Sequence, residues 1–360
     1  MQERAQQYRA AIAEMAARCT SCGKCVRPCH FLRTHGSPAY LAQRGDEPDT
    51  ISLAMQCSLC GACDARCPLS LQPSALFLAM RQEAQRQNLI DLAPYQPWLR
   101  YESLGRSRLF RRYHNPHAST VAFFPGCSFP GGRPAGVMTL YRLIQQVTPH
   151  AGLVLDCCNK ISHDLGTHAS FESHLTSLRK RLQDHGFTTL LTACPGCTSI
   201  FERYAATEIT CKNVYQYLVE QGATIPETYN ASGTVRLHDP CPSRFDNVQQ
   251  KAVRYLLAQT GVKLEEIPEH GRSTRCCGQG GMVEAILPGT VAQEATLLHD
   301  TAAGDPMVTT CGGCCEALGR TGTVMHLADL LHQNGPAPKA TTTSLSKWLN
   351  RLKLRFMRLV

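Results

Sequence analysis

Two cysteine runs near the N-terminus constrain this chain more than any other feature of its sequence. The first begins at Cys19 and reads CTSCGKCVRPC, and the second begins at Cys57 and reads CSLCGACDARCP. Each has the spacing C-x2-C-x2-C-x3-C, in which three thiolates converge on one iron–sulfur cubane and the fourth ligates the other. We therefore expect two [4Fe–4S] clusters, one held by Cys19, Cys22, Cys25 and Cys67 and the other by Cys57, Cys60, Cys63 and Cys29.

Zinc and disulfide bonds explain these runs less well. A zinc site needs cysteine pairs separated by a longer loop and has no use for the third cysteine of each run. A disulfide framework needs an exported chain, whereas the segment that starts at Met1 is charged and amphipathic, without an apolar signal region. We expect a cytoplasmic protein whose cysteines serve metal or redox chemistry.

Length and charge set wider bounds. The 360 residues suggest two or three domains, and no stretch approaches the roughly 18 apolar residues of a membrane span. The net charge of +9 gathers in two basic blocks, and the first is interpreted as a solvated or partner-facing surface. No zinc finger, recognition helix or RNA-binding signature accompanies the blocks, so nucleic acid is not expected as a partner. The blocks are Arg100, Arg106, Arg108, Arg111 and Arg112, and then Lys347, Arg351, Lys353, Arg355 and Arg358.

Residues 1–99 are expected to form an α-helical ferredoxin module. Apolar residues at helical spacing predict a helix over 3–18, and Gln72-Pro73-Ser74 begins a second helix that ends near Gln87. Glycines and prolines between the two cysteine runs predict a loop around a short helical turn. The Arg-rich segment 100–118 is expected to be a basic linker.

From Val121 onward a cysteine pattern appears twice: a single cysteine, an adjacent pair and a C-x2-C motif. The copies are Cys127, Cys157, Cys158, Cys194 and Cys197, and Cys241, Cys276, Cys277, Cys311 and Cys314. Strand-like runs over 121–124, 153–155, 189–192, 235–238 and 307–309 alternate with helical stretches over 135–148, 170–185 and 249–260. This alternation predicts two α/β units with mainly parallel sheets, over 119–228 and 229–335, with the cysteines beyond the strand ends.

Adjacent cysteines cannot both chelate one metal ion comfortably, but they can bridge two irons of a larger cluster; the alternative is a set of reduced core cysteines. The layout over roughly residues 5–335 resembles the D subunit of membrane-bound heterodisulfide reductases, in which a ferredoxin module precedes two cysteine-rich CCG domains. It is also similar to the iron–sulfur subunits of glycolate oxidase, lactate utilisation and anaerobic glycerol-3-phosphate dehydrogenase.

The resemblance implies one or two further iron–sulfur clusters on the ten repeated cysteines, of a noncubane [4Fe–4S] type in the heterodisulfide branch. It implies disulfide cleavage at the second copy, where Cys241, Cys276, Cys277, Cys311 and Cys314 would be the catalytic residues. The second copy keeps the family's glycine at Gly278, whereas Asn159 stands at that place in the first copy and leaves its cluster type open.

Three further cysteine and histidine positions fall outside this assignment. Cys211 is interpreted as a small buried residue, and Cys315 as an alternative ligand. His238, just before Cys241, could donate a proton to a departing thiolate or make a hydrogen bond behind the ligands, and the sequence leaves both open.

Residues 336–360 are expected to form a linker and a basic amphipathic helix that begins at Ser344. Its apolar stripe is Leu345, Leu349, Leu352, Phe356 and Leu359, with Trp348 alongside and Lys347, Arg351, Arg355 and Arg358 on a basic stripe. Such a helix suits the surface of an anionic bilayer, and docking on the protein's own body or on a partner subunit is the alternative.

These features predict an iron–sulfur oxidoreductase subunit. No GxGxxG lies at a strand-to-helix turn, so a flavin or nicotinamide is expected on a partner flavoprotein or dehydrogenase subunit. The resemblance implies that the acceptor is a disulfide cleaved at the CCG site. In the alternative, the chain is a non-catalytic electron carrier that tethers a dehydrogenase to quinone on the inner face of the cell membrane.

Overall fold

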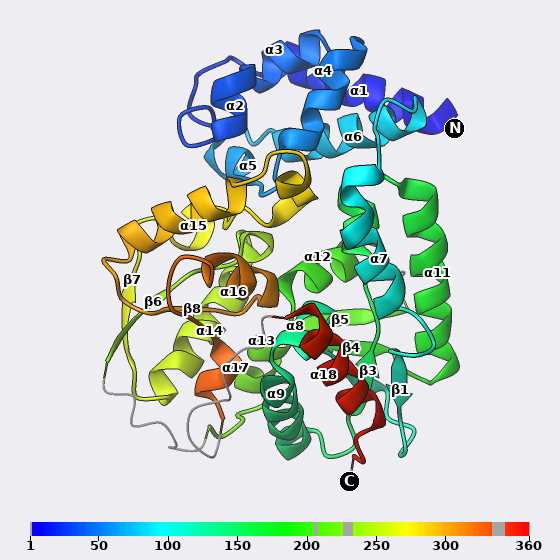
Figure 1. Cartoon of the computed structure of the whole chain (residues 1–360), viewed down its shortest axis with the longest axis vertical. Coiled ribbons are helices and arrows are strands. Elements are labelled where there is room, and N and C mark those ends of the chain that lie inside the picture. Colours follow the sequence, from blue (N-terminus) through cyan, green and yellow to red (C-terminus); the bar gives the residue numbers. More distant parts are fainter. Residues whose placement is uncertain (1, 205–207, 226–232, 333–342, 360) are drawn as a thin grey trace.

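The computed structural model describes residues 2–204, 208–225, 233–332 and 343–359 (Figure 1). The N-terminal part of the chain is all-helical, and two α/β units follow it. The N-terminal helices are α1 (Gln2–Arg18), α2 (His30–His35), α3 (Pro38–Gln43), α4 (Pro48–Leu53), α5 (Ala62–Arg66) and α6 (Pro73–Arg86), with the 3-10 turns η1 (Ala54–Gln56) and η2 (Ala93–Tyr95). The two long helices, α1 and α6, lie within one residue of their predicted bounds and pack on each other through a shared apolar core.

The segment between the two cysteine runs differs from the expected loop around one turn, because it contains the three short helices α2, α3 and α4. Ser37 caps α3, with its Oγ accepting a hydrogen bond of 3.2 Å from the Tyr40 amide. Pro38 and Pro48 occupy the first positions of α3 and α4, where a missing N–H costs nothing. The prolines that suggested a loop therefore begin helices instead.

The segment expected to be a basic linker is also regular structure. It contains most of α7 (Gln96–Gly105) and all of β1 (Arg112–His114). Glu102 on α7 is 1% exposed, and its carboxylate accepts a hydrogen bond of 3.0 Å from the Ser162 amide of the first α/β unit. Strand β1 pairs antiparallel with the edge of the first sheet. The segment over 100–118 thus contains a helix and a strand, and both of its ends pack on the first unit.

The first sheet has the order β1-β3-β2-β4-β5, and all pairs except β1–β3 are parallel. Its strands after β1 are β2 (Val121–Phe124), β3 (Gly152–Leu155), β4 (Thr189–Thr192) and β5 (Thr210–Asn213). Its helices are α8 (Ser128–Gly132), α9 (Pro134–Val147), α10 (Lys160–Asp164), α11 (His168–Asp184), α12 (Pro195–Tyr204) and α13 (Val214–Glu220).

The second sheet is entirely parallel, with the order β7-β6-β8-β9, which is the order of the four parallel strands of the first sheet. Its strands are β6 (Thr234–Leu237), β7 (Lys263–Glu266), β8 (Met307–Thr309) and β9 (Val324–His326). Its helices are α14 (Asn247–Gln259), α15 (Thr290–Thr301), α16 (Gly312–Leu318) and α17 (Leu327–Leu330), with the 3-10 turns η3 (Cys241–Ser243), η4 (Gly271–Ser273) and η5 (Gly280–Ala285).

One apolar core joins the two units. It contains Val137 and Leu140 of α9 together with Leu256 of α14 and Leu327 of α17, all at most 1% exposed. As expected for parallel α/β units, cysteines follow the carboxyl ends of central strands, with Cys127 after β2 and Cys311 after β8. Because the shared core holds the two units together, the positions of these strand ends are fixed relative to each other.

The C-terminal helix α18 (Ser344–Phe356) docks on the protein's own body, beside α8 and α7 (Figure 1). Arg351 and Leu354 on this helix are 3% and 1% exposed. The predicted apolar stripe is not the docked face: Leu345, Leu349 and Phe356 remain 71%, 49% and 69% exposed. Residues 336–342 of the expected linker lie outside the described residues. Among the described helices, none has the length and apolar character that a membrane crossing requires.

Candidate metal centres

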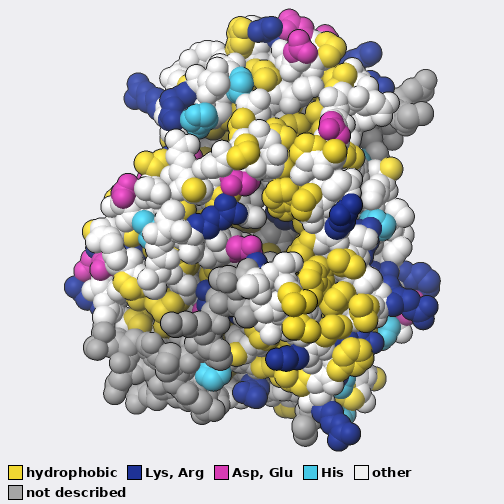
Figure 2. Space-filling view, in the orientation of Figure 1, with side chains coloured by type: hydrophobic (Ala, Val, Ile, Leu, Met, Phe, Trp, Pro, Cys, Tyr) yellow, Lys and Arg dark blue, Asp and Glu magenta, His cyan; other side chains and the backbone are white. Residues whose placement is uncertain are grey.

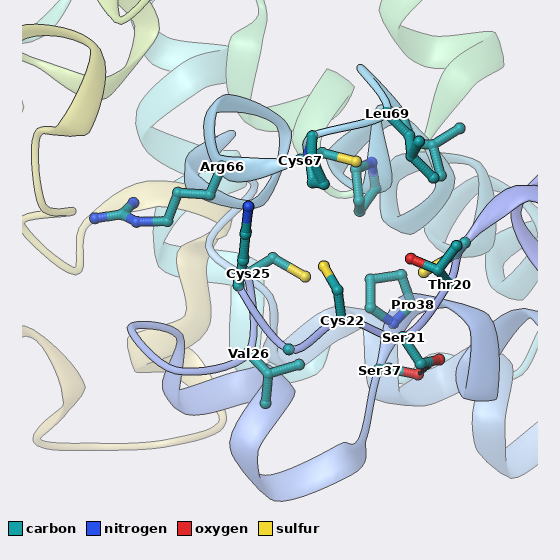
Figure 3. A pocket seen from close by; sticks show the side chains of 16 residues that line it. Thr20, Ser21, Cys22, Cys25, Val26, Ser37, Pro38, Arg66, Cys67 and Leu69 are labelled. Carbon is teal, nitrogen blue, oxygen red and sulfur yellow. Dashed lines mark hydrogen bonds between the residues drawn. The ribbon is translucent and has the colours of Figure 1, made fainter.

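Cys19, Cys22, Cys25 and Cys67 line one pocket between the end of α1 and the end of α5 (Figure 3). In Figure 3 the sulfurs of Cys22 and Cys25 point toward each other, and the Cys67 side chain reaches the same space from the opposite wall. Gly23 has a φ of +75°, which lets the loop turn tightly between Cys22 and Cys25. The four cysteines that the interleaved pattern assigns to one cubane thus come together.

Cys29, Cys57, Cys60 and Cys63 line a second pocket, which also includes Cys276 of the second α/β unit. The Leu59 amide donates a hydrogen bond of 3.4 Å to the Cys57 sulfur. Arg244, which is fully buried, donates a hydrogen bond of 3.1 Å to the carbonyl oxygen of Cys60. This pocket therefore lies at the boundary between the helical region and the second unit.

The donor chemistry of both pockets fits iron–sulfur clusters. All twenty cysteines are free thiols, so none is consumed in a disulfide. Burial, with smaller contributions from Cys19, Cys22 and Cys67, raises the pKa of Cys25 to about 11. Four crowded thiols ionise together only beside a compensating positive charge, which a cluster's iron supplies.

In the second unit, the five repeated cysteines lie close together at the carboxyl edge of the sheet. The sulfurs of Cys277 and Cys314 are 3.3 Å apart. The thiol of Cys276 lies near that of Cys241, and the thiol of Cys311 lies near that of Cys314. Gly278 has a φ of +81°, and a Cβ there would lie 3.0 Å from the Val291 Cα, so the glycine lets α15 approach the cysteine pair.

The first unit has the same arrangement. The sulfurs of Cys158 and Cys197 are 3.2 Å apart, and the Cys127 thiol lies near that of Cys157. Asn159 adopts a left-handed conformation, with a φ of +60°, at the place where the second unit has Gly278. Asparagine is among the few side chains that tolerate this conformation, so the replacement of glycine keeps the backbone turn.

The three groups of cysteines are neighbours. Cys60 of the helical region and Cys276 of the second unit line one pocket, and Cys311 of the second unit lies near Cys194 of the first. Lys160 of α10 lies beside the thiols of Cys158 and Cys241, one from each unit, and pairs with Asp164 at 2.7 Å. A continuous series of sulfurs therefore runs from the helical region through the second unit to the first.

His238 is fully buried, and one of its ring nitrogens, the Cys277 sulfur and the Cys314 sulfur all lie within 4.8 Å of one another. This position is compatible with both roles that the sequence left open.

Cys211 lies on β5 with its sulfur 3.6 Å from the Thr192 hydroxyl, and this position agrees with a packing role. Cys315 is buried on α16, where burial raises its pKa to about 12.

Two arginines beside the cysteines were not identified from the sequence. Arg81 on α6 is fully buried. It donates hydrogen bonds to the carbonyl oxygens of Cys57 in the helical region, Asp164 in the first unit and Gly281 in the second. Arg351 on α18 donates hydrogen bonds to the carbonyl oxygens of Cys127 at 3.1 Å and Gly105 at 3.0 Å. One signal in the sequence could have indicated that these arginines are buried. Each lies on the same helix face as an aromatic residue three or four positions earlier, Phe77 for Arg81 and Trp348 for Arg351.

Comparisons with known proteins agree with this arrangement. A family model described as "4Fe-4S dicluster domain" matches residues 15–71, and one described as "Cysteine-rich domain" matches residues 235–319. The chain is 23% identical over 303 residues to the B subunit of fumarate reductase (CoM/CoB) of Methanothermobacter marburgensis, covering 75% of this chain but only 60% of that relative. It is 22% identical over 339 residues to the D subunit of dihydromethanophenazine:CoB–CoM heterodisulfide reductase of Methanosarcina barkeri, covering 75% of this chain and 79% of that relative.

These matches confirm the resemblance to the D subunit of heterodisulfide reductases that the cysteine pattern indicated. The chain combines a ferredoxin-like 4Fe–4S region with cysteine-rich α/β structure built on parallel strands. Its relatives are subunits of oxidoreductases, which supports the role of an oxidoreductase subunit.

Proposed function

We propose that this chain is the iron–sulfur subunit of an oxidoreductase that takes electrons from a partner flavoprotein or dehydrogenase and delivers them to a disulfide. The helical domain, residues 1–99, would hold two [4Fe–4S] cubanes, and a duplicated CCG domain would hold one or two further clusters. Iron–sulfur clusters supply one-electron transfer when bound. The chain would act in the cytoplasm, with peripheral contact to the inner face of the cell membrane through residues 344–360.

The proposed ligand sets follow the pockets. Cys19, Cys22, Cys25 and Cys67 would hold one cubane, and Cys57, Cys60, Cys63 and Cys29 the other. Cys127, Cys157, Cys158, Cys194 and Cys197 would serve the first CCG domain, and Cys241, Cys276, Cys277, Cys311 and Cys314 the second. The second set would be the catalytic one, because Cys276 lines the same pocket as Cys60 of the second cubane set.

The shared pocket of Cys60 and Cys276 carries this proposal. Cys22, in the first pocket, is exposed, which gives a partner access to that end of the series. Cys60 and Cys276 line one pocket, so the second cubane would be the neighbour of the second CCG site. This arrangement supports electron flow from an exposed entry to a buried site.

At that site, a disulfide takes up two electrons and two protons as its S–S bond breaks and two thiols form. Lys160 would stabilise thiolate charge as it develops, because its ammonium group lies beside Cys158 and Cys241. His163 contacts the Asp164 carboxylate at 2.8 Å, so it would hold the orientation of Asp164 toward Lys160.

One observation favours the alternative acceptor, a membrane quinone. Leu345, Leu349 and Phe356 on α18 remain exposed although the helix is docked, and such side chains suit a bilayer surface. In this alternative the chain carries electrons and tethers a dehydrogenase, and no disulfide is cleaved.

The test is anaerobic reduction of a panel of small disulfides with reduced viologen as the donor. We expect activity in the wild type, a loss of at least about 100-fold in Cys276→Ser, and little change in the matched control Cys211→Ser. A wild-type protein that reduces a quinone analogue but no disulfide would favour the alternative. Full activity of Cys276→Ser would contradict the assignment of the second CCG site.

A further inference from the structure

The two basic blocks of the sequence meet at one pocket on the surface of the first unit. Its lining includes Arg108 and Arg111 from the segment between α7 and β1, Arg112 from β1, Arg181 from α11, and Arg355 from α18. The pocket has a volume of about 360 Å³. It lies apart from the cysteines, so neither the clusters nor the disulfide chemistry accounts for it.

The positive charge of this pocket is largely uncompensated. Asp156 accepts hydrogen bonds from Arg181, at 3.0 Å, and from the Tyr113 hydroxyl. Within residues 2–204, 208–225, 233–332 and 343–359, no carboxylate pairs with any of the other four lining arginines. Like charges held this close repel one another, and a bound anion would offset that repulsion.

The individual arginines are arranged to leave donors for a ligand. Arg112 is fixed by hydrogen bonds to the carbonyl oxygens of Leu354, at 3.1 Å, and Met357, at 2.7 Å, which hold the end of α18 at the pocket. The Nε atom of Arg355 is buried and has no hydrogen-bond partner in the described structure. Arg108 is exposed, and it makes no ion pair with a described residue.

We infer that this pocket binds the phosphate group of an anionic ligand, and that the favoured source is the headgroup of an anionic phospholipid. Guanidinium groups match the geometry of phosphate oxygens, each offering a planar fork of N–H donors. The inference does not depend on the electron acceptor or on the cluster types.

The apolar surroundings of the pocket favour a lipid as the source. Phe356 and Met357, next to Arg355, are 69% and 38% exposed, and Leu109, next to Arg108, is 54% exposed. Figure 2 shows hydrophobic side chains gathered over the part of the molecule where Figure 1 places α18. Apolar side chains beside clustered arginines match a bilayer surface, where the acyl boundary and the phosphates lie at adjacent depths.

The test compares Arg108→Gln/Arg111→Gln with the control Arg9→Gln/Lys251→Gln, using the cluster-loaded full chain under anaerobic conditions. Arg9 and Lys251 are exposed on α1 and α14, so the control removes the same charge away from the pocket. Binding is measured by flotation with phosphatidylglycerol-containing vesicles and with pure phosphatidylcholine vesicles, and by calorimetry with inorganic phosphate and pyrophosphate. Iron content and circular dichroism check that both variants fold.

We expect the wild type to bind the phosphatidylglycerol-containing vesicles and not the phosphatidylcholine vesicles. Its affinity for the former should be roughly 30-fold higher than that of the pocket variant, and the affinity of the control should differ from that of the wild type by less than about threefold. If the wild type binds pyrophosphate but not vesicles, and only the pocket variant loses this binding, the pocket is a phosphate site whose ligand is a soluble molecule. Equal losses in the two variants would overturn the inference, because net charge would then explain the binding. It is also overturned if the wild type binds neither vesicles nor phosphates.

Discussion

The Nη1 atom of Arg81 donates a hydrogen bond of 2.9 Å to the carbonyl oxygen of Gly281, in the turn that follows the cysteine pair of the second unit. The same guanidinium donates to the carbonyl oxygens of Cys57, at 2.6 Å, and Asp164, at 2.7 Å. A Cβ at Gly281 would lie 2.6 Å from the Cys57 oxygen, so only glycine permits this approach. One buried arginine thus fixes the helical region against both α/β units beside the pocket that Cys60 and Cys276 line.

Replacing Arg81 with lysine is expected to destabilise the protein by about 3–5 kcal/mol. Lysine cannot donate to several carbonyl oxygens in a planar fork, so buried acceptors would be left unpaired. The measurement is anaerobic urea denaturation followed by circular dichroism. Arg86→Lys is the matched control, because Arg86 lies on the same helix but its side chain is 40% exposed and pairs with Glu83. Equal midpoints for the two variants would contradict the role assigned to Arg81.

Substitutions of Asn159 test whether its left-handed backbone conformation is what the first unit requires. Asn159→Gly should keep the iron content of the wild type, since glycine adopts a φ of +60° freely. It should lose only about 1 kcal/mol of stability, with the hydrogen bond of 3.1 Å that the Asn159 side chain donates to the Cys157 carbonyl oxygen. Asn159→Val should lose about 1–3 kcal/mol and part of the iron, because a β-branched residue is strained there. Iron analysis and thermal denaturation provide the measurements. The explanation fails if glycine is as damaging as valine.

Arg351 is expected to raise the reduction potential of a cluster held near Cys127. Its buried guanidinium donates to the Cys127 carbonyl, and a nearby positive charge favours the added electron. Arg351→Gln should therefore shift one cluster signal to a more negative potential, by an amount on the order of tens of millivolts. EPR-monitored redox titration measures the shift.

Lys353→Gln provides the control for Arg351, because Lys353 is exposed on the same helix and is expected to leave every potential unchanged. A deletion of residues 344–360 should reproduce the shift of Arg351→Gln, since it removes the same charge. Identical potentials in the wild type and in Arg351→Gln would show that α18 does not influence the first unit's site.

How much of the sheets could be predicted depended on where each strand lies. The five strands identified from the sequence, β2, β3, β4, β6 and β8, lie inside their sheets and are apolar. Those missed among the described residues, β1, β5, β7 and β9, are the sheet edges. Edge strands are half exposed, and polar residues such as those of Lys263–Glu266 fit them without producing an apolar pattern.

The cysteine groups could be predicted because ligand spacing is local, and both pockets gather the expected cysteines. The proximity of Cys60 to Cys276 and of Cys194 to Cys311 could not, because it depends on how separately folded elements pack. The burial of Arg81 has the same cause, since its acceptors come from carbonyl oxygens far apart in the sequence. For α18 the sequence left membrane binding and docking on the protein's own body open, and the structure shows that Arg351 and Leu354 form a docked face.

His326 should make the protein less stable below pH 6.5. Burial, followed by repulsion from Arg133, lowers the pKa of His326 from 6.5 to about 3 in the folded protein. Between these values the unfolded chain binds the proton and the folded chain does not, so stability is complete above pH 6.5 and falls with acidification. The loss is at most about 1.4 kcal/mol per pH unit.

His326→Asn should remove this part of the pH dependence. The ring Nδ1 accepts a hydrogen bond of 3.2 Å from the Ala328 amide, and an asparagine oxygen can cap α17 in the same way. Urea denaturation at several pH values compares the variant with the wild type and with His117→Asn, whose side chain is exposed. If the slopes of all three proteins agree between pH 5 and 7, His326 is not the source.

The most direct test of the central claim is an anaerobic iron and sulfide count, combined with EPR of the reduced and oxidised protein with and without an added thiol. The account predicts about sixteen irons, or about twelve if only one CCG domain is loaded, and an oxidised-state signal that changes when thiol is added. About eight irons, with reduced-cubane signals alone, would confine the clusters to the helical region and contradict disulfide reduction at the repeated cysteines.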